Sequence, residues 1–178
     1  MEDVSLVLEC VNGNAKAQRE LFEKFSRKMH TVCLRYTNSV EEAEDILQEG
    51  FIKTFSKLHL FNKEGSLEGW IRRIMVNTAI DAIRKNTKYV KDVSLDVVDY
   101  QLGINDYVLE KLKEKDLLLL INSMPNGYKV VFNMFSIEGY GHKEIAEILG
   151  ISESTSKSQY MRAKSYLKER LETQGYER

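Results

Sequence analysis

Residues 141–171 read GHKEIAEILGISESTSKSQYMRAKSYLKERL, and their spacing predicts two helices joined by a tight turn. Apolar side chains at Ile145, Ala146, Ile148 and Leu149 recur at helical spacing and form one compact face. Gly150 follows this face, and glycine readily adopts the left-handed backbone conformation that ends a helix. The first of the two helices is therefore expected to end at this glycine.

The corner after Gly150 carries the residues of a helix-turn-helix. Ile151 can fill the space between the helices, and the hydroxyl of Ser152 can cap the second helix. Ala146 is small and lies four residues before the glycine, so the two helices can approach closely. The inward stripe of the second helix is made of Tyr160, Ala163, Leu167 and Leu171.

Polar and cationic side chains occupy the rest of the second helix, although the chain as a whole has a net charge of −1. Lysine and arginine match guanine edges or phosphates, glutamine can pair with adenine, and the helix N-terminus favours a phosphate. The pattern therefore predicts DNA contact, against the alternative of a solvated helix in a bundle. The residues expected to face outward and contact DNA are Ser154, Thr155, Lys157, Ser158, Gln159 and Arg162.

Composition favours an all-α protein. The chain has 178 residues, 43% of them hydrophobic, and a single proline, and its amphipathic stretches are long. Its start does not resemble a signal peptide, and the longest purely apolar run, residues 117–121, is far shorter than the ~20 residues that span a bilayer. We therefore expect a cytoplasmic protein without membrane insertion.

Neither catalysis nor a metal site is expected. Cys10 and Cys33 form neither a disulfide framework nor a metal half-site, and His30 with Cys33 would supply only two ligands. The sequence contains no glycine-rich phosphate loop and no motif of a serine hydrolase or zinc protease. We therefore predict no enzyme activity, no cofactor and no metal.

Helical periodicity also covers most of the remaining chain. It predicts helices over residues 14–37, 41–58 with Ser39 as N-cap, 67–88, 108–124 and 128–139. Residues 89–105 lack a sustained period and contain several acids, which indicates a linker. We therefore predict two small helical domains, at residues 1–88 and 116–178, joined by a linker at 89–115.

The helix expected over residues 67–88 carries a second polar stripe. Arg73, Asn77, Asp81, Arg84 and Lys88 recur at intervals of four, four, three and four, so they share one side of the helix. Such a stripe suits nucleic acid or is simply a solvated face, and the spacing alone does not separate these two interpretations.

At this point the chain resembles the extracytoplasmic-function (ECF, group IV) sigma factors of the bacterial sigma-70 family. The resemblance rests on three stretches that appear in the family's order. They are EEAEDILQEGFIKTF, GSLEGWIRRIMVNTAIDAIRK and MPNGYKVVFNMFSIEGYGHKEIAEILGISESTSKSQYMRAKSYL. The resemblance implies a sigma region 2-like domain followed by a region 4-like domain that contains the helix-turn-helix.

The resemblance also implies roles for residues of the N-terminal domain. An acidic helix at the place of Asp45, Gln48 and Glu49 binds the clamp helices of the largest subunit of RNA polymerase core. The helix after Trp70 and the loop before it bind the −10 element of promoter DNA as it opens, and an asparagine at the place of Asn77 helps to hold a flipped base. The residues implied in −10 binding are Asn62, Lys63, Trp70, Arg73, Asn77, Asp81, Arg84 and Lys88.

In the C-terminal domain the resemblance implies binding of the −35 element as duplex, and it implies an anti-sigma factor as partner. The chain departs from the family pattern at four positions. Ser156 replaces an aliphatic residue, Gln159 an arginine, Tyr160 a leucine and Gly141 a capping serine. Gln159 loses a charge and shifts the expected base preference towards adenine, so the −35 sequence does not follow from the resemblance.

Two other functions are compatible with these patterns. A helix-turn-helix regulator would bind duplex operators without RNA polymerase. A sigma-like adaptor would bind an anti-sigma factor yet never support transcription. The acidic helix beside the polar stripe of residues 73–88 favours the sigma factor over the ordinary regulator.

Overall fold

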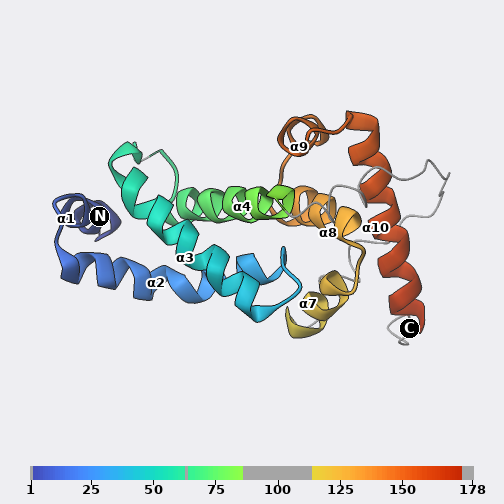
Figure 1. The fold of residues 1–178 in the computed structure, drawn as a ribbon, viewed down its shortest axis with the longest axis horizontal. Helices are drawn as coiled ribbons and strands as arrows, with labels where there is room; N and C mark the ends of the chain where they lie inside the picture. Colours follow the sequence, from blue (N-terminus) through green and yellow to red (C-terminus); the bar gives the residue numbers. More distant parts are fainter. Residues whose placement is uncertain (1, 63, 86–113, 174–178) are drawn as a thin grey trace. The chain divides into compact units, whose positions relative to one another are not determined.

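The computed structural model describes residues 2–62, 64–85 and 114–173, and these residues form helices and no strand (Figure 1). The chain divides into two compact units, Met1–Ala82 and Ile83–Arg178. The all-α class predicted from composition is confirmed. The predicted linker at 89–105 and the first residues of the helix expected at 108–124 lie outside the described residues.

Unit 1 is built from four α-helices and one 3-10 turn. They are α1 (Glu2–Val11), α2 (Ala15–Leu34), α3 (Val40–Lys57), η1 (Leu58–Leu60) and α4 (Leu67–Lys85), the last of which runs three residues beyond the unit. In Figure 1, α2 and α3 lie side by side, and α1 packs against α2 and η1. The three helices predicted here are confirmed to within three residues wherever their ends are described, whereas α1 was not predicted.

Side-chain caps set the starts of these helices. The Ser39 hydroxyl accepts a hydrogen bond from the backbone N–H of Glu42 at 3.1 Å, which confirms the predicted N-cap of α3. Ser66 does the same for α4, accepting from the N–H of Gly69 at 3.0 Å. These caps satisfy backbone donors that have no partner within the helix.

The core of unit 1 lies between α2, α3 and α4. Its side chains are at most 7% exposed, and Phe51 of α3 packs on the more exposed Phe22 of α2 with ring centroids 4.7 Å apart. The buried apolar residues of these three helices are Ala17, Leu21, Phe25, Met29, Val32, Cys33, Ala43, Ile46, Phe51, Leu67, Ile71, Met75, Val76, Ala79 and Ile80. Phe51 of the acidic helix is therefore a core residue.

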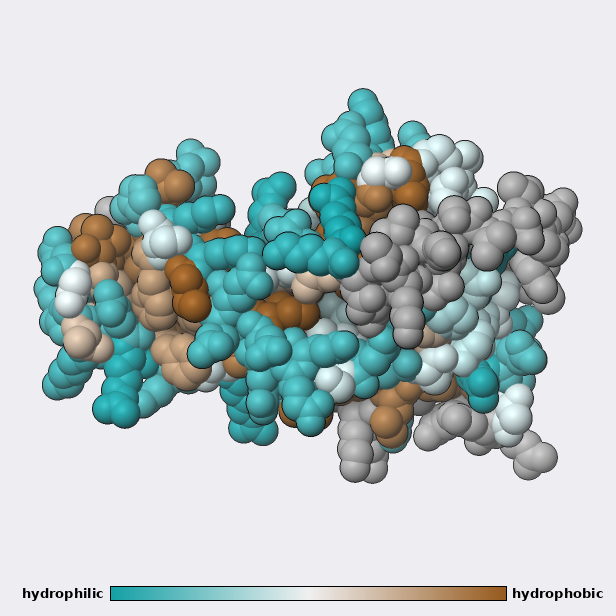
Figure 2. Space-filling view, viewed as in Figure 1, coloured by the Kyte–Doolittle hydropathy of each residue, from teal (hydrophilic) through white to brown (hydrophobic). Residues whose placement is uncertain are grey.

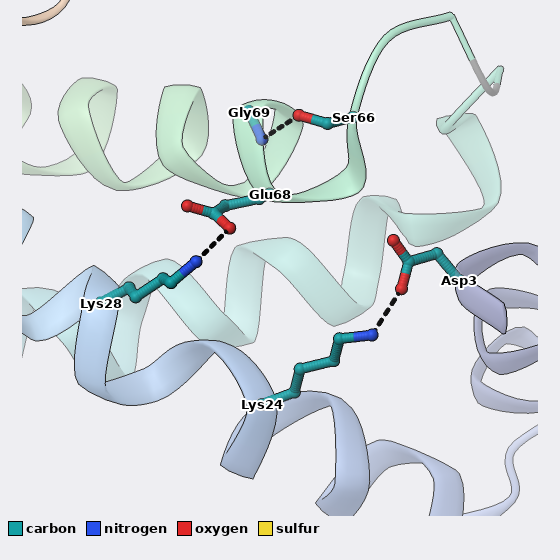
Figure 3. A network of polar contacts seen from close by, with 6 residues as sticks. All are labelled: Asp3, Lys24, Lys28, Ser66, Glu68 and Gly69. Atoms are coloured by element: carbon teal, nitrogen blue, oxygen red, sulfur yellow. Dashed lines mark hydrogen bonds and ion pairs between the residues drawn. The ribbon is translucent and has the colours of Figure 1, made fainter.

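Two ion pairs tie the outer surface of unit 1 together (Figure 3). Lys24 of α2 contacts Asp3 of α1, and Lys28, one turn further along α2, contacts Glu68 of α4, each at 2.7 Å. All four side chains are more than one third exposed, so each pair contributes at most about 1 kcal/mol. The pairs therefore link α1 and α4 to α2 but add little to the free energy of unfolding of the unit.

Unit 2 contains α7 (Glu114–Asn122), α8 (Asn126–Phe132), the π-helical segment η2 (Asn133–Ile137), α9 (His142–Leu149) and α10 (Glu153–Thr173). The helix predicted over residues 128–139 is therefore an α-helix that widens into a π turn from Asn133 onward. Side-chain periodicity predicted the helix but not this change of winding, because the extra residue per turn depends on how the segment packs.

Three helices, α7, α8 and α9, pack against α10, and the largest apolar cluster of unit 2 lies between α7, α8 and α10. Ala163, Leu167 and Leu171 of α10 are buried, which confirms most of the stripe predicted from the sequence. Tyr160, the fourth member of the stripe, is only half-buried and stacks on Phe132. The residues of this core are Leu120, Ile121, Met124, Phe132, Ala163, Leu167 and Leu171.

Hydrophilic residues cover most of the face in Figure 2, where apolar residues appear as separate patches. Among the helices in the described ranges, none has both the length and the apolarity that crossing a membrane requires.

A close approach at Gly50 of α3 gives a test of the core of unit 1. A Cβ atom at this position would lie far inside van der Waals contact with Sδ of the buried Met75. Overpacking costs about 1–3 kcal/mol, and the better helix propensity of alanine offsets roughly 1 kcal/mol of that. Gly50→Ala is therefore expected to lower the free energy of unfolding by up to about 2 kcal/mol, measured in urea by the fluorescence of Trp70, the single tryptophan.

The Met75→Ala background is the control, because it removes the atoms that a Cβ at position 50 would meet. In that background Gly50→Ala is expected to stabilise unit 1 by up to about 1 kcal/mol, through helix propensity alone. Equal effects of Gly50→Ala in both backgrounds would show that the close contact does not limit this position.

Candidate nucleic-acid interface

The turn between α9 and α10 has the geometry expected of a helix-turn-helix. Gly150 is left-handed, with φ 68° and ψ 36°. The N–H of Ile151 donates to the carbonyl of Ala146 at 3.0 Å, and the Ser152 hydroxyl accepts from the N–H of Thr155 at 3.0 Å. The predicted glycine turn and serine cap are both confirmed. At the start of α9, a carboxylate oxygen of Glu144 accepts from the N–H of Gly141 at 2.8 Å, which is the half of a capping box that needs no side chain at position 141.

The structure separates the six residues of α10 predicted to face outward. Ser154 and Lys157 are exposed, and Thr155 and Ser158 are half-buried. Gln159 and Arg162, in contrast, are only 2% and 9% exposed, so the outward orientation predicted for them is wrong. The reason is that α7, α8 and α9 all contact α10, and the buried arc of the helix is wider than its apolar stripe.

Gln159 and Arg162 belong to a set of buried polar residues in unit 2 that the sequence analysis did not identify. Lys129 of α8, Asn133 of η2 and Ser156 of α10 are fully buried as well. Because a buried polar group without a partner is costly, such groups interact within the protein. The only signal in the sequence was their helical spacing: Lys129 and Asn133 are four apart, and Ser156 and Gln159 are three apart.

His142 links α9 to α10 through Ser156. The ring Nδ1 lies 3.0 Å from the Ser156 hydroxyl, and the ring stacks on Phe135 with centroids 4.3 Å apart. Tyr160 meets the same ring edge-on at 5.7 Å. Ser156, which departs from the aliphatic residue of the family pattern, is therefore used as a polar contact between the two helices of the motif.

Burial and a nearby cation disfavour protonation of the His142 ring. Burial and then the nearby Lys157 ammonium lower the pKa of His142 from its ordinary 6.5, and the Glu153 carboxylate opposes them. Lys157 in turn pairs with Glu153 at 2.6 Å and holds the pKa of that carboxyl below its usual range. The exposed Lys157 cation at the start of α10 thus lies near a neutral histidine at the start of α9.

In unit 1, the polar stripe of α4 lies on the surface. Arg73, Asn77, Asp81 and Arg84 are all exposed, so the shared polar face predicted from their spacing is present, while Lys88 lies outside the described residues. Half-buried Trp70 packs on Phe61 with ring centroids 5.6 Å apart.

The loop before α4 contributes one described residue to the predicted −10 set. Asn62 is exposed, and its side chain accepts a hydrogen bond from the N–H of Glu64 at 3.2 Å. Lys63, the other predicted loop residue, lies outside the described residues. The loop therefore places an ordered polar side chain shortly before α4.

The acidic helix α3 presents the three residues predicted for protein binding. Asp45, Gln48 and Glu49 are exposed and share one side of the helix. Glu49 pairs with Lys53 at 2.8 Å, and the Lys53 ammonium also lies 3.8 Å from Asp81 in the stripe of α4. Lys53 thus partly neutralises the one acid of that stripe.

Cysteine and histidine do not gather into a metal site in the described residues, where no three metal-ligating side chains lie together. Burial raises the pKa of the Cys33 thiol to about 12, and burial with nearby glutamates raises that of Cys10. Both thiols are buried and protonated at neutral pH, which suits packing rather than metal or redox chemistry.

His142 provides a pH test of the helix-turn-helix. Because the folded protein disfavours the protonated ring, the unfolded chain binds more protons below pH 6.5. Unit 2 is therefore expected to lose stability as the pH falls from about 6.5 through the folded-state pKa.

An NMR titration of the His142 ring should have its midpoint below 6.5. Lys157→Ala should raise this midpoint, whereas Lys164→Ala, on the same helix, should not. A wild-type midpoint at or above 6.5 would contradict the electrostatics described here.

Each of the two units matches a family model of the same protein family, sigma-70. Residues 21–89 match the family model of sigma-70 region 2, and residues 114–167 match that of sigma-70 region 4. The chain is 31% identical over 159 residues to the RNA polymerase sigma factor SigZ of Bacillus subtilis, with 86% of each chain covered. It is 26% identical to the ECF RNA polymerase sigma factor SigW of the same species, over 89% of this chain and 91% of the relative.

Solved structures have the same fold. The Bartonella quintana sigma factor RpoE, in a complex with the anti-sigma factor NepR, matches with a TM-score of 0.53 at 20% identity, over 86% of this chain and 96% of that one. CnrH, in a complex with the cytosolic domain of CnrY, matches with a TM-score of 0.51 at 18% identity, over 94% and 96%. The capped helix-turn-helix, the acidic helix and the polar stripe are consistent with this similarity. The two matched regions and the relatives establish that the chain belongs to the ECF sigma factors of the sigma-70 family.

Proposed function

We propose that this sigma factor directs RNA polymerase core to promoters with two spaced elements and assists melting at the −10 element. The carrying observation is that one chain presents three surfaces. These are the exposed acidic side of α3, the exposed polar stripe of α4 and the exposed start of a capped recognition helix. An ordinary helix-turn-helix regulator needs only the third.

The surfaces divide between the two units. We assign residues 1–88 to core and −10 binding, 89–115 to a linker and 116–178 to −35 binding. Asp45, Gln48 and Glu49 contact the clamp helices of core polymerase, and the α4 stripe with Asn62 and Trp70 contacts the opening −10 element. Lys63 and Lys88 complete the −10 set by family resemblance.

For the −35 element, the exposed start of α10 is the primary reading surface. Ser154, Thr155, Lys157 and Ser158 are exposed or half-buried there. Gln159 and Arg162 can join them only if their side chains leave the buried positions that they have in this structure. Arginine is long enough to reach out from a partly buried stem, so Arg162 is the better candidate of the two.

Regulation by an anti-sigma factor fits the same surfaces, because a partner that covers either unit would block polymerase or promoter binding. The chain itself supplies no catalysis, cofactor or metal in this function. Two alternatives remain distinguishable by experiment: a regulator that binds duplex DNA without polymerase, and an adaptor that binds only an anti-sigma factor.

In vitro transcription tests the proposal directly. Purified bacterial core polymerase is supplied with a randomised promoter library, with and without the protein. Protein-dependent transcripts that share two upstream elements are expected. Duplex binding without core association would favour the regulator, and core association without transcripts from any library member would favour the adaptor.

The acidic side of α3 gives a prediction for core binding. Asp45→Ala combined with Gln48→Ala is expected to weaken association with core polymerase at least tenfold in a fluorescence titration, because interface contacts concentrate in few residues. Glu20→Ala is the control for loss of one negative charge: Glu20 is an exposed acid of α2 and does not belong to the proposed surface of α3. Equal weakening by the control would mean that overall charge, not this face, governs association.

The α4 stripe gives a prediction for melting. Asn77→Ala is expected to reduce open-complex formation several-fold while duplex promoter binding stays within about twofold, because the contact forms only with an extruded base. Permanganate reactivity of unpaired thymines measures opening, and an electrophoretic shift at low temperature measures duplex binding. Parallel loss of both signals would assign Asn77 to duplex binding instead.

A further inference from the structure

Met161 is an exposed apolar residue in the middle of the recognition helix. Its side chain is 37% exposed. The other large apolar side chains in the described part of α10 are buried or half-buried. Met161 does not belong to the apolar core of unit 2, whose members on this helix are Ala163, Leu167 and Leu171. Leaving such a side chain in water forgoes burial of its apolar surface, which a bound partner would recover.

The residues that share this side of α10 are polar or cationic. Met161 lies four residues after Lys157 and three after Ser158, so all three side chains are neighbours on the helix surface. Lys157 and Ser154 are exposed as well. Glu153, the acid at the start of the helix, is paired with Lys157 at 2.6 Å. The surface around Met161 therefore suits a polyanion that also offers small apolar groups.

The position of Met161 along α10 fits a major groove. It is the ninth residue of the helix, so it lies about 12 Å from the first along the axis, and the groove is about 12 Å wide. The one apolar group that the major groove presents is the C5-methyl of thymine. An unbranched, flexible methionine side chain can follow such a methyl group closely.

We propose that Met161 contacts the C5-methyl group of a thymine in the duplex element read by α10, and so helps to determine promoter specificity. This inference rests on the proposed −35 function of unit 2. A protein partner on the same surface is less compatible with it, because the apolar area is a single side chain flanked by lysine and serines.

Thymine-to-uracil replacement tests the contact, because it removes one methyl group and leaves every hydrogen-bonding group in place. Holoenzyme is assembled from the full-length protein and core polymerase, and its preferred upstream duplex is selected from a randomised library. Each thymine of the selected element, on both strands, is then replaced singly by deoxyuridine. Wild-type holoenzyme is expected to bind about fourfold more weakly at one or two of these positions, the loss expected for one buried methyl-sized group.

Variants of Met161, tested on the same thymine and uracil duplexes, show whether this side chain makes the contact. Met161→Ala should bind the thymine duplex about fourfold more weakly than wild type and should not distinguish thymine from uracil at the sensitive position. Met161→Leu, which keeps an apolar side chain, should retain most of the discrimination. Lys157→Ala should weaken both duplexes equally. Leu119→Ala is the control for loss of an exposed apolar side chain, because Leu119 is 61% exposed on α7, and it should behave as wild type.

Three outcomes would overturn the inference, and they are distinguishable. Unchanged thymine discrimination by Met161→Ala, or none by wild type, would remove Met161 from DNA reading and leave the proposed function intact. Weaker core association of Met161→Ala with normal DNA discrimination would assign the residue to a protein contact. If no duplex can be selected, the −35 function of unit 2 fails, and the Met161 contact fails with it.

Discussion

The left-handed turn at Gly150 is the constraint on which the rest of unit 2 depends. Its φ of 68° ends α9 and turns the chain. Ser152, two residues later, can then cap α10 by accepting from the N–H of Thr155. For any residue with a Cβ atom this conformation would cost about 1 kcal/mol or more. Because the turn sets the angle between the two helices, it also decides which side of α10 lies against the core and which side stays exposed.

The contact between α9 and α10 is polar at Ser156, where the family pattern has an aliphatic residue. His142 and Ser156 join α9 to α10 by a contact of 3.0 Å beneath a ring stack with Phe135. A polar pair of this kind depends on protonation, unlike the aliphatic contact that it replaces. The contact between α9 and the start of α10 is therefore sensitive to acid through His142.

Unit 1 combines two surfaces on one packed core. Phe51 anchors α3 in the core against α2, while the acidic side of the same helix is exposed. Lys53 connects Glu49 on that side with Asp81 in the stripe of α4. Lys53 thus links the charge on the acidic side of α3 to the charge of the polar stripe of α4.

The sequence by itself determined the helices other than α1, the caps at Ser39 and Ser152, the turn at Gly150 and the exposed stripe of α4, because each depends on local spacing and backbone chemistry. Only the tertiary structure decided that Gln159 and Arg162 are buried, that residues 133–137 wind as a π-helix, and that His142 meets Ser156. Side-chain periodicity reveals one apolar stripe of a helix. How far burial extends beyond that stripe depends on how many other helices pack against it, and α10 has three such neighbours.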